Sequence, residues 1–206
     1  MYVWGNPKIT QQGGVVNKLP YVTASPGIVY SFTFSCHKRL SLFIDSAIYD
    51  LFEKNLGDVR NKHRLFLIAW VIMPNHVHIL LTPSYEIKLS SIARDLKQKV
   101  GYYGLTIVKT LDQQLYSKLV VTTGTTRKTR FWLERRGYVR PVSVEEDIHI
   151  LIDYIHRNPE RWKLVTSPED WLYSSARYWL LGDERDLTPN PPEWLMDMPP
   201  TDRLRG

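Results

Sequence analysis

Two histidines stand one residue apart inside the aliphatic run WVIMPNHVHILLTP, residues 70–83. Successive side chains of a strand point to opposite faces, so His76 and His78 share one face while Val77 and Ile79 face the core. Two imidazoles about 6–7 Å apart on one face could hold one divalent ion. Alternatively they are half-exposed strand residues without a role, because two ligands alone do not make a metal site. The pair therefore needs a third ligand from elsewhere.

A second chemical candidate lies in the segment DYIHRNP, residues 153–159. On a helix, Tyr154 and Asn158 are four residues apart and share a face, which is offset from the apolar stripe of that helix. Tyrosine can act as a nucleophile and form a covalent intermediate. An asparagine can offer its carbonyl oxygen to a hard cation. The alternative is that Tyr154 packs beside the core while Asn158 caps the helix end before Pro159.

His149 and His156 lie on the same predicted helix, with Asp153 four residues after the first and three before the second. This spacing lets a histidine and a carboxylate meet on one helix face. We therefore expect one or both histidines to be surface residues that pair with Asp153. His156 is also a second-rank candidate for orienting a phosphate or the ligands of a metal.

Basic residues interleaved with aromatic ones fill the segment from Arg127 to Arg140, which has six Lys or Arg and one acid. Basic groups hold phosphates and aromatic rings stack on unpaired bases, so the mixture suits single-stranded or hairpin nucleic acid. An ordinary solvated face is the alternative for any one basic segment. The residues expected to contact DNA are Arg127, Lys128, Arg130, Trp132, Arg135, Arg136, Arg140, Lys38, Arg39 and Lys97. Phe131 and Tyr138 are further aromatic residues interleaved in the 127–140 segment.

Length and composition narrow the class of protein. A chain of 206 residues is most simply one domain, and its formal net charge of +6 favours an anionic partner such as nucleic acid. The single cysteine, Cys36, excludes a disulfide within the chain and a Cys-rich zinc site. No signal peptide is recognisable, and no segment approaches about 18 consecutive apolar residues. We therefore expect a cytoplasmic protein without a membrane span.

Apolar periodicity predicts the elements that would position these residues. Strands are expected at 28–36, 64–75 and 76–83, and a strand or hairpin at 131–142. Helices are expected at 45–59, 88–105, 143–158 and within 167–182. Ser143 and Glu146 form a capping box at the start of the third helix. The threonine-rich, basic stretch 122–130 is expected to be a loop. Adjoining strands favour a small antiparallel or mixed sheet with helices packed on it, an α+β sandwich.

Four segments together resemble the REP-associated tyrosine transposases, which are HUH single-strand transposases of bacterial insertion sequences. They are, in order, VIMPNHVHILLTP, RFWLERRGYVRPV, DYIHRNPERWKLV and PEDWLYSSARYW. The resemblance covers roughly residues 29–180 and implies a central antiparallel sheet of the ferredoxin-like or RRM-like type. We expect residues 28–182 to form the transposase domain. Residues 1–27 would be an N-terminal extension, and 183–206 a Pro-rich tail that is extended on the surface or disordered.

The resemblance also implies a reaction. His76 and His78 match the paired histidines, Tyr154 the nucleophile, and Asn158 the third ligand of a Mg²⁺ or Mn²⁺ ion, where related insertion-sequence enzymes have Gln. Tyr154 would attack single-stranded DNA near hairpin-forming repeats, giving a 5′-phosphotyrosine and a free 3′-OH. The expected partner is hairpin-bearing single-stranded DNA. The protein would be a monomer or homodimer in the bacterial cytoplasm, associated with the nucleoid.

Two other functions stay open at this point. The chain could be a DNA- or RNA-hairpin-binding protein of the same fold that has lost catalysis. It could also be a metal-dependent phosphoesterase that uses water as its nucleophile. Replacement of Tyr154 by phenylalanine separates the two enzymes, because only a tyrosine transesterase needs the phenol oxygen.

Overall fold

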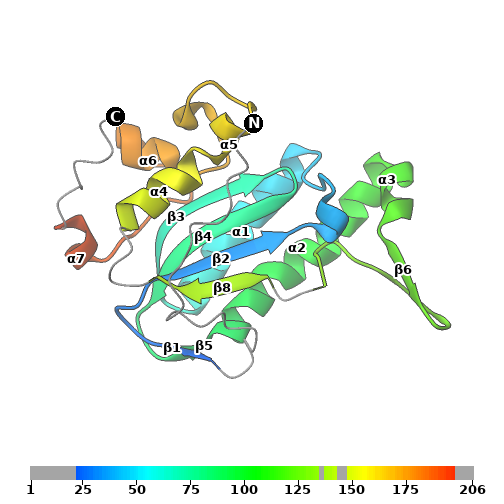
Figure 1. The fold of residues 1–206 in the computed structure, drawn as a ribbon, viewed down its shortest axis with the longest axis horizontal. Coiled ribbons are helices and arrows are strands. Elements are labelled where there is room, and N and C mark those ends of the chain that lie inside the picture. Colours follow the sequence, from blue (N-terminus) through cyan, green and yellow to red (C-terminus); the bar gives the residue numbers. More distant parts are fainter. Residues whose placement is uncertain (1–21, 135–136, 143–147, 198–206) are drawn as a thin grey trace, which may run out of the picture.

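The computed structural model describes residues 22–134, 137–142 and 148–197. Their centre is a four-stranded antiparallel sheet in the order β3-β4-β2-β8 (Figure 1). Its strands are β2 (Tyr30–Ser35), β3 (Leu65–Met73), β4 (His76–Pro83) and β8 (Tyr138–Pro141). Helix α1 (Ser46–Lys62) follows β2, and α2 (Leu89–Leu111) follows β4. This is the ferredoxin-like β-α-β-β-α-β order, so the predicted fold class is confirmed.

The two faces of the sheet are covered by different helices. Val77 and Ile79 of β4 are fully buried in the larger core cluster, which also contains apolar residues of α1 and α2. Helix α4 (Ile148–His156) packs against β3, and its residue Ile152 joins Leu80 in a second cluster. The β4 side chains that alternate with Val77 and Ile79 therefore point to the face that α4 covers.

The long helices begin and end for local reasons. Asp45 caps α1, its carboxylate accepting a hydrogen bond from Ala47 N–H at 2.9 Å. Helix α2 continues past its predicted end because buried residues recur on the same face as far as Val108. At Gly104 an added Cβ would lie 2.7 Å from Phe131 Cε2, so a glycine is required where this ring packs on α2.

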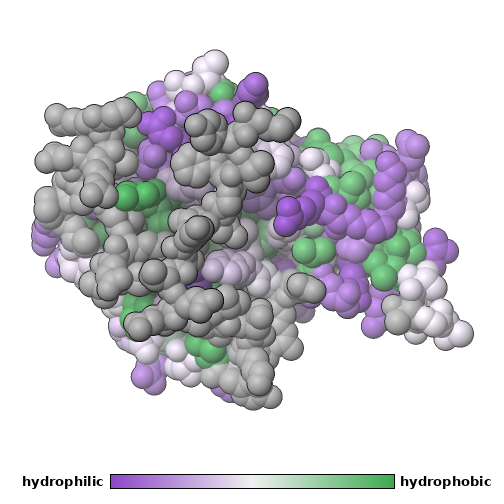
Figure 2. All heavy atoms as spheres, viewed as in Figure 1, coloured by the Kyte–Doolittle hydropathy of each residue, from purple (hydrophilic) through white to green (hydrophobic). Residues whose placement is uncertain are grey.

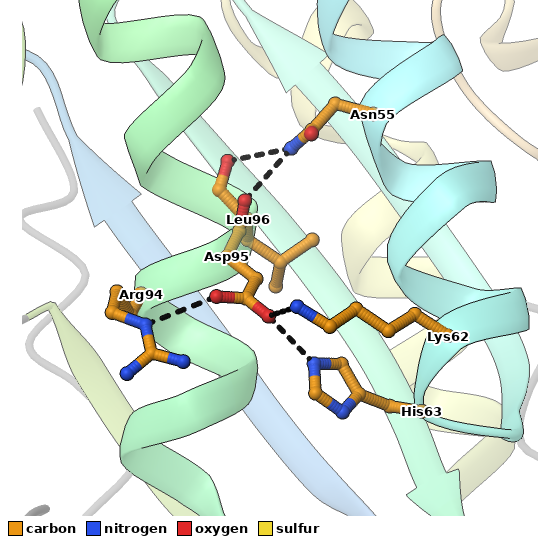
Figure 3. A network of polar contacts seen from close by, with 6 residues as sticks. All are labelled: Asn55, Lys62, His63, Arg94, Asp95 and Leu96. Atoms are coloured by element: carbon orange, nitrogen blue, oxygen red, sulfur yellow. Dashed lines mark hydrogen bonds and ion pairs between the residues drawn. The ribbon is translucent and has the colours of Figure 1, made fainter.

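A polar network joins α1 to α2 (Figure 3). The Asp95 carboxylate accepts from Lys62 Nζ at 2.6 Å, lies 2.9 Å from His63 Nε2, and accepts from Arg94 Nε at 3.1 Å. Burial raises the pKa of Asp95, but these hydrogen bonds outweigh it and hold the pKa at about 2. Asn55 adds hydrogen bonds from its amide to the carbonyls of Asp95 and Leu96.

Replacing Asp95 by asparagine is expected to lower the free energy of unfolding by about 1.5–3 kcal/mol at pH 7, because charged hydrogen bonds are lost. The folded pKa lies below its ordinary value of 3.8, so this stabilisation is complete above that pH and disappears as pH falls through about 2. Urea unfolding at pH 7 and at acid pH measures it. The control Asp58→Asn removes an exposed pair with Lys99 and should cost no more than about 1 kcal/mol.

The stretch expected to be a loop is instead a β-hairpin. After α3 (Gln113–Lys118), strands β6 (Val120–Thr123) and β7 (Thr126–Thr129) pair in antiparallel register. The turn between them starts at Gly124, whose φ of 58° is readily adopted only without a side chain. β-Branched residues on both sides of a Gly-X turn favour a hairpin, which outweighs the polarity that suggested a loop.

The free edge of β3 is covered by residues from the C-terminal part of the chain. Ser175 N–H donates to Trp70 O at 3.1 Å, and Trp70 N–H donates to Ser175 Oγ at 3.0 Å. Ile72 N–H donates to Tyr173 O at 2.9 Å. The segment predicted to hold one helix therefore forms a 3₁₀ turn, η3 (Pro168–Asp170), a stretch along β3, and helix α6 (Ala176–Leu181).

Part of the predicted tail also packs on β3. The Asn190 side chain accepts from Leu67 N–H at 2.8 Å and donates to Leu65 O at 3.2 Å. In α7 (Glu193–Met196), Leu195 is fully buried in the cluster beneath α4. The expectation of an extended surface tail is therefore wrong for these residues, because their amide and apolar groups find partners on the sheet.

The N-terminal residues that the structure describes are attached to the fold as well. Strand β1 (Thr23–Ala24) pairs with β5 (Ile87–Lys88), and Ala24 is fully buried. The capping box at Ser143 and Glu146 lies outside the described residues. Within the described segments, no helix is long and apolar enough to cross a membrane.

Candidate functional site

His76 and His78 lie together at the start of β4, on the face that α4 covers. Their ring centroids are 4.9 Å apart, with the rings nearly perpendicular at 87°. Both are partly buried, whereas Val77 and Ile79 between and beside them are fully buried on the other face. Strand alternation predicted this arrangement, and it is confirmed.

Two polar neighbours orient the histidine rings. His76 Nδ1 lies 2.6 Å from Asn75 Oδ1, and His78 Nδ1 lies 2.8 Å from Thr33 Oγ1. An amide oxygen only accepts, so His76 Nδ1 carries the proton and Nε2 keeps its lone pair. The Thr33 hydroxyl can accept from His78 Nδ1 in the same tautomer, which would leave His78 Nε2 available. Partners of this kind hold metal-binding histidines in position.

The protein environment keeps both rings neutral. Burial lowers the pKa of His76 to about 4, and the positive charge of Arg39 acts in the same direction. Burial likewise lowers the pKa of His78 to about 3, with a further contribution from His76. A metal binds only the neutral imidazole, so these rings are in the binding form near neutral pH.

Tyr154 of α4 reaches the same place. Its ring centroid is 5.9 Å from that of His78, and 43% of the residue is exposed, so it is not a core tyrosine. The guanidinium carbon of Arg161, in α5 (Asn158–Arg161), lies 4.9 Å from the Tyr154 ring centroid. This is cation–π geometry, and it places a positive charge beside the phenol.

His156 connects the tyrosine helix to the sheet. It is buried, and its Nε2 lies 2.8 Å from Ser175 Oγ, the atom that accepts from Trp70 N–H of β3. Burial lowers the pKa of His156 to about 3. The expectation that it is a surface partner of Asp153 is wrong, because Asp153 instead accepts from Arg157 Nε at 2.8 Å. His156 thus positions α4.

Asn158 lies at the junction of α4 and α5. It is buried, and its Nδ2 donates to Tyr154 O at 2.7 Å and to Ile155 O at 3.4 Å. The amide therefore caps α4, as the alternative interpretation predicted. Within the described residues no hydrogen bond engages its Oδ1, the atom that a cation would take. The His78 ring contacts the rings of His76 and Tyr154, and Asn158 is connected to them through the Tyr154 backbone.

The described residues supply two imidazoles and one amide oxygen as candidate ligands for a divalent ion. Among the described residues, no group of three or more His, Cys, Asp or Glu could hold a metal. A protein ligand beyond the two imidazoles would therefore have to be of another type, and the Asn158 amide oxygen is the candidate. Imidazole nitrogen suits transition ions and an amide oxygen suits hard cations, so this mixed set alone does not select one metal.

Two residues beside the histidines were not predicted from the sequence. Trp162 is 53% exposed, and its ring centroid is 5.7 Å from that of His76. Arg39, expected only as a DNA contact, is close enough to His76 to lower its pKa. It lies in the 3₁₀ turn η2 (His37–Arg39), where both Lys38 and Arg39 have φ above 50°. Left-handed conformations of this kind cost about 1–3 kcal/mol each and cluster at functional sites.

The other predicted DNA contacts are dispersed. Arg127 and Lys128 are exposed on β7, and Arg130 pairs with Glu134 at 2.6 Å. Lys97 of α2 lies over the Phe34 ring, Lys38 Nζ donates to Lys118 O, and Arg140 is on β8. Arg135 and Arg136 lie outside the described residues.

Trp132 and Phe131 cannot stack on bases as expected, because both are buried. Trp132 is 7% exposed, its Nε1 donates to Lys97 O at 2.9 Å, and it packs against Phe34 and Phe52. Phe131 is 2% exposed. The interleaved aromatic residues here are two consecutive rings that pack into the larger core cluster. Tyr138, which is 43% exposed, remains open to solvent.

Comparisons with known proteins show the family of the chain and support its fold. The model of a family described as IS200-like transposase matches residues 24–158, more than half of the chain, including all four candidate site residues. A solved REP-associated tyrosine transposase bound to a REP hairpin is 21% identical, with a TM-score of 0.56 over 80% of this chain and 90% of that chain. A Deinococcus radiodurans structure assigned as a transposase is 19% identical, with a TM-score of 0.42 over 63% and 88%. No curated protein matches the chain.

Proposed function

Because the chain belongs to the IS200-like transposase family, we propose that it cleaves and rejoins single-stranded DNA through a covalent bond to Tyr154. The observation that carries this proposal is the placement of a partly exposed tyrosine beside two neutral histidines. The His78 ring is 4.9 Å from that of His76 and 5.9 Å from that of Tyr154. Nucleophile and candidate metal ligands therefore meet at one point of the surface.

Each residue of the proposed site has a separate role. His76 and His78 would hold a Mg²⁺ or Mn²⁺ ion through Nε2, and Asn158 would contribute Oδ1. A bound ion of this kind polarises a phosphate and neutralises the charge that develops on it. Asn75 and Thr33 would hold the imidazole rings in the orientation that binds the ion, and His156 would hold α4 against β3. Arg161 adds a positive charge beside the phenol, where the phosphate would arrive.

Tyr154 is the nucleophile of the proposed reaction. Its Oη forms a bond to phosphorus, the bond from phosphorus to the 3′ oxygen breaks, and the phenol proton is released while the 3′ oxygen takes up a proton. The products are a 5′-phosphotyrosine and a free 3′-OH. Attack by a 3′-OH on the tyrosine ester reverses the step and joins two strands. The ester conserves the bond energy, so no nucleotide cofactor is needed.

The substrate that suits this surface is a strand with an unpaired segment next to a hairpin. The similar solved structure is bound to a REP hairpin. Trp162, exposed beside His76, offers a face on which an unpaired base could stack next to the scissile phosphate. Because His78 and Tyr154 of a single chain are in contact, the site does not require a second copy, which supports a monomer as the active form.

The decisive experiment looks for the covalent intermediate. The purified protein, with Mg²⁺ or Mn²⁺ and a labelled hairpin-bearing DNA strand, should give a protein band that carries the label after denaturation. Adding a chelator should prevent its formation. Cleavage without an adduct would indicate a phosphoesterase that uses water. Tight hairpin binding without cleavage, across several hairpins and both metals, would indicate a binding protein that has lost catalysis.

A further inference from the structure

We propose that the hairpin formed by β6 and β7, residues 120–129 and here called the arm, binds the double-stranded stem of the DNA hairpin. The kind of DNA rests on the proposed function. The arm extends away from the sheet (Figure 1), and in the described part of the chain its two strands pair only with each other. Arg130 N–H donates to the carbonyl of the buried Leu119 at 3.1 Å, which anchors its base.

The charge of the arm suits nucleic acid. From Gln113 to Leu133 the sequence contains four basic residues and no Asp or Glu. Arg127 and Lys128 are exposed, and neither forms an ion pair within the described residues. Strand alternation sends these two cations to opposite faces of β7, so this strand can approach a phosphate backbone with either face. A protein partner would have to bring acids, whereas DNA carries its charge in every nucleotide.

The residue types favour a duplex over a single strand. Single strands are held by aromatic rings that stack on bases, and the sequence has no aromatic residue from Ser117 to Arg130. Threonines and a glycine form the tip. In Figure 2 the projecting end of the molecule is a pale surface with hydrophilic, purple residues beside it. Threonine can offer both a hydroxyl and a methyl group to base edges in a groove. Exposed rings lie outside the arm, among them Tyr102 and Tyr103 of α2, and Tyr154 and Trp162 beside the histidines.

The size of the arm fits a DNA groove. Each strand has four residues, which span about 13 Å. The major groove of B-form DNA is about 12 Å wide and admits a two-stranded β-ribbon. At the base of the arm, a groove of about 730 Å³ runs between α2 and residues 129–132, and its lining includes Lys97 and Arg130. Phosphates flanking the stem can continue along it.

The position of the arm would let it bind the double-stranded stem while the unpaired part of the DNA reaches the candidate site. The chain that leaves β7 pairs at once with the end of β2, where Leu133 N–H donates to Ser35 O at 2.9 Å. Ser35 is in turn the partner of His76 in the sheet. The arm and the histidines therefore belong to the same end of the sheet. A stem held by the arm would deliver its unpaired flank toward Tyr154.

The test compares two DNA probes and two charge-matched variants of the full chain. One probe is a hairpin with a stem of about 12 base pairs, slightly more than one helical turn, and a single-stranded tail; the other is the tail alone. The arm variant is R127Q/K128Q. The control is K54Q/K88Q, which removes the same charge from exposed lysines of α1 and β5. The dissociation constant is measured as a function of salt.

For the arm variant, the slope of log affinity against log salt on the hairpin should fall by about 2, because each lost phosphate contact removes about 0.9. Its slope on the tail should stay unchanged, and the control should match the wild type on both probes. An unchanged hairpin slope, or an equal loss on hairpin and tail, would overturn the proposal. These binding slopes do not depend on whether a covalent adduct forms, so failure of the proposed reaction would be recognised separately.

Discussion

Tyr154→Phe is expected to abolish both DNA cleavage and the covalent adduct, with a loss of about 10⁴-fold or more in rate, as when other enzymes lose a nucleophile. The substitution removes only the phenol oxygen, so the ring keeps its contacts with His78 and Arg161. Affinity for hairpin DNA should be unchanged because it depends on phosphate contacts. Single-turnover cleavage and gel analysis of the adduct measure the first effect, and a binding titration the second.

The matched control is Tyr85→Phe. Tyr85 is exposed to a similar extent, 41% against 43%, but lies beyond the far end of β4 from the histidines. This variant should cleave as the wild type does. If Tyr154→Phe still cleaved at the wild-type rate, the nucleophile would be water or another residue, and the tyrosine mechanism would have to be abandoned.

His76→Ala and His78→Ala should each reduce metal-dependent cleavage by more than about 100-fold. Loss of an outer partner of a metal ligand already costs about 10–100-fold, and a lost ligand costs more. DNA binding measured in the presence of a chelator should be retained, because affinity depends mainly on contacts between basic residues and phosphates. The effect is followed by cleavage rates over a range of Mg²⁺ and Mn²⁺ concentrations.

Thr33→Val provides a graded comparison for the histidine variants. It keeps the shape of the side chain but removes the hydroxyl that lies 2.8 Å from His78 Nδ1. An intermediate loss, about 10–100-fold and partly restored at high metal concentration, is expected. Cleavage that is independent of metal, or unaffected in either alanine variant, would show that the two imidazoles do not form a metal site.

The candidate site was predictable from the sequence as far as local geometry extends. Strand alternation places His76 and His78 on one face, and helical spacing keeps Tyr154 off the buried stripe of α4. Bringing the two elements together is a tertiary event that no local pattern encodes. The family resemblance supplied that step, and the 5.9 Å contact between His78 and Tyr154 is its structural counterpart.

The errors have a common physical cause. His156 and Trp132 are polar or amphipathic residues whose hydrogen-bond partners, Ser175 and Lys97 O, come from distant parts of the chain. Without those partners each residue was assigned to the surface. One signal in the sequence pointed to Ser175, because it belongs to the motif PEDWLYSSARYW that carries part of the family resemblance. Its role in joining α4 to β3 depends on tertiary contacts that the sequence does not show.

The covered edge of β3 has a consequence for how the protein behaves in solution. This strand, LFLIAWVIM, is one of the most apolar segments of the chain and would otherwise present open backbone groups to neighbouring molecules. Such an edge is a template for intermolecular strand pairing and aggregation. Tyr173, Ser175 and Asn190 occupy those groups. The C-terminal segment thus protects this edge, so its removal would expose β3 to aggregation and would also remove the Ser175 hydroxyl that contacts His156.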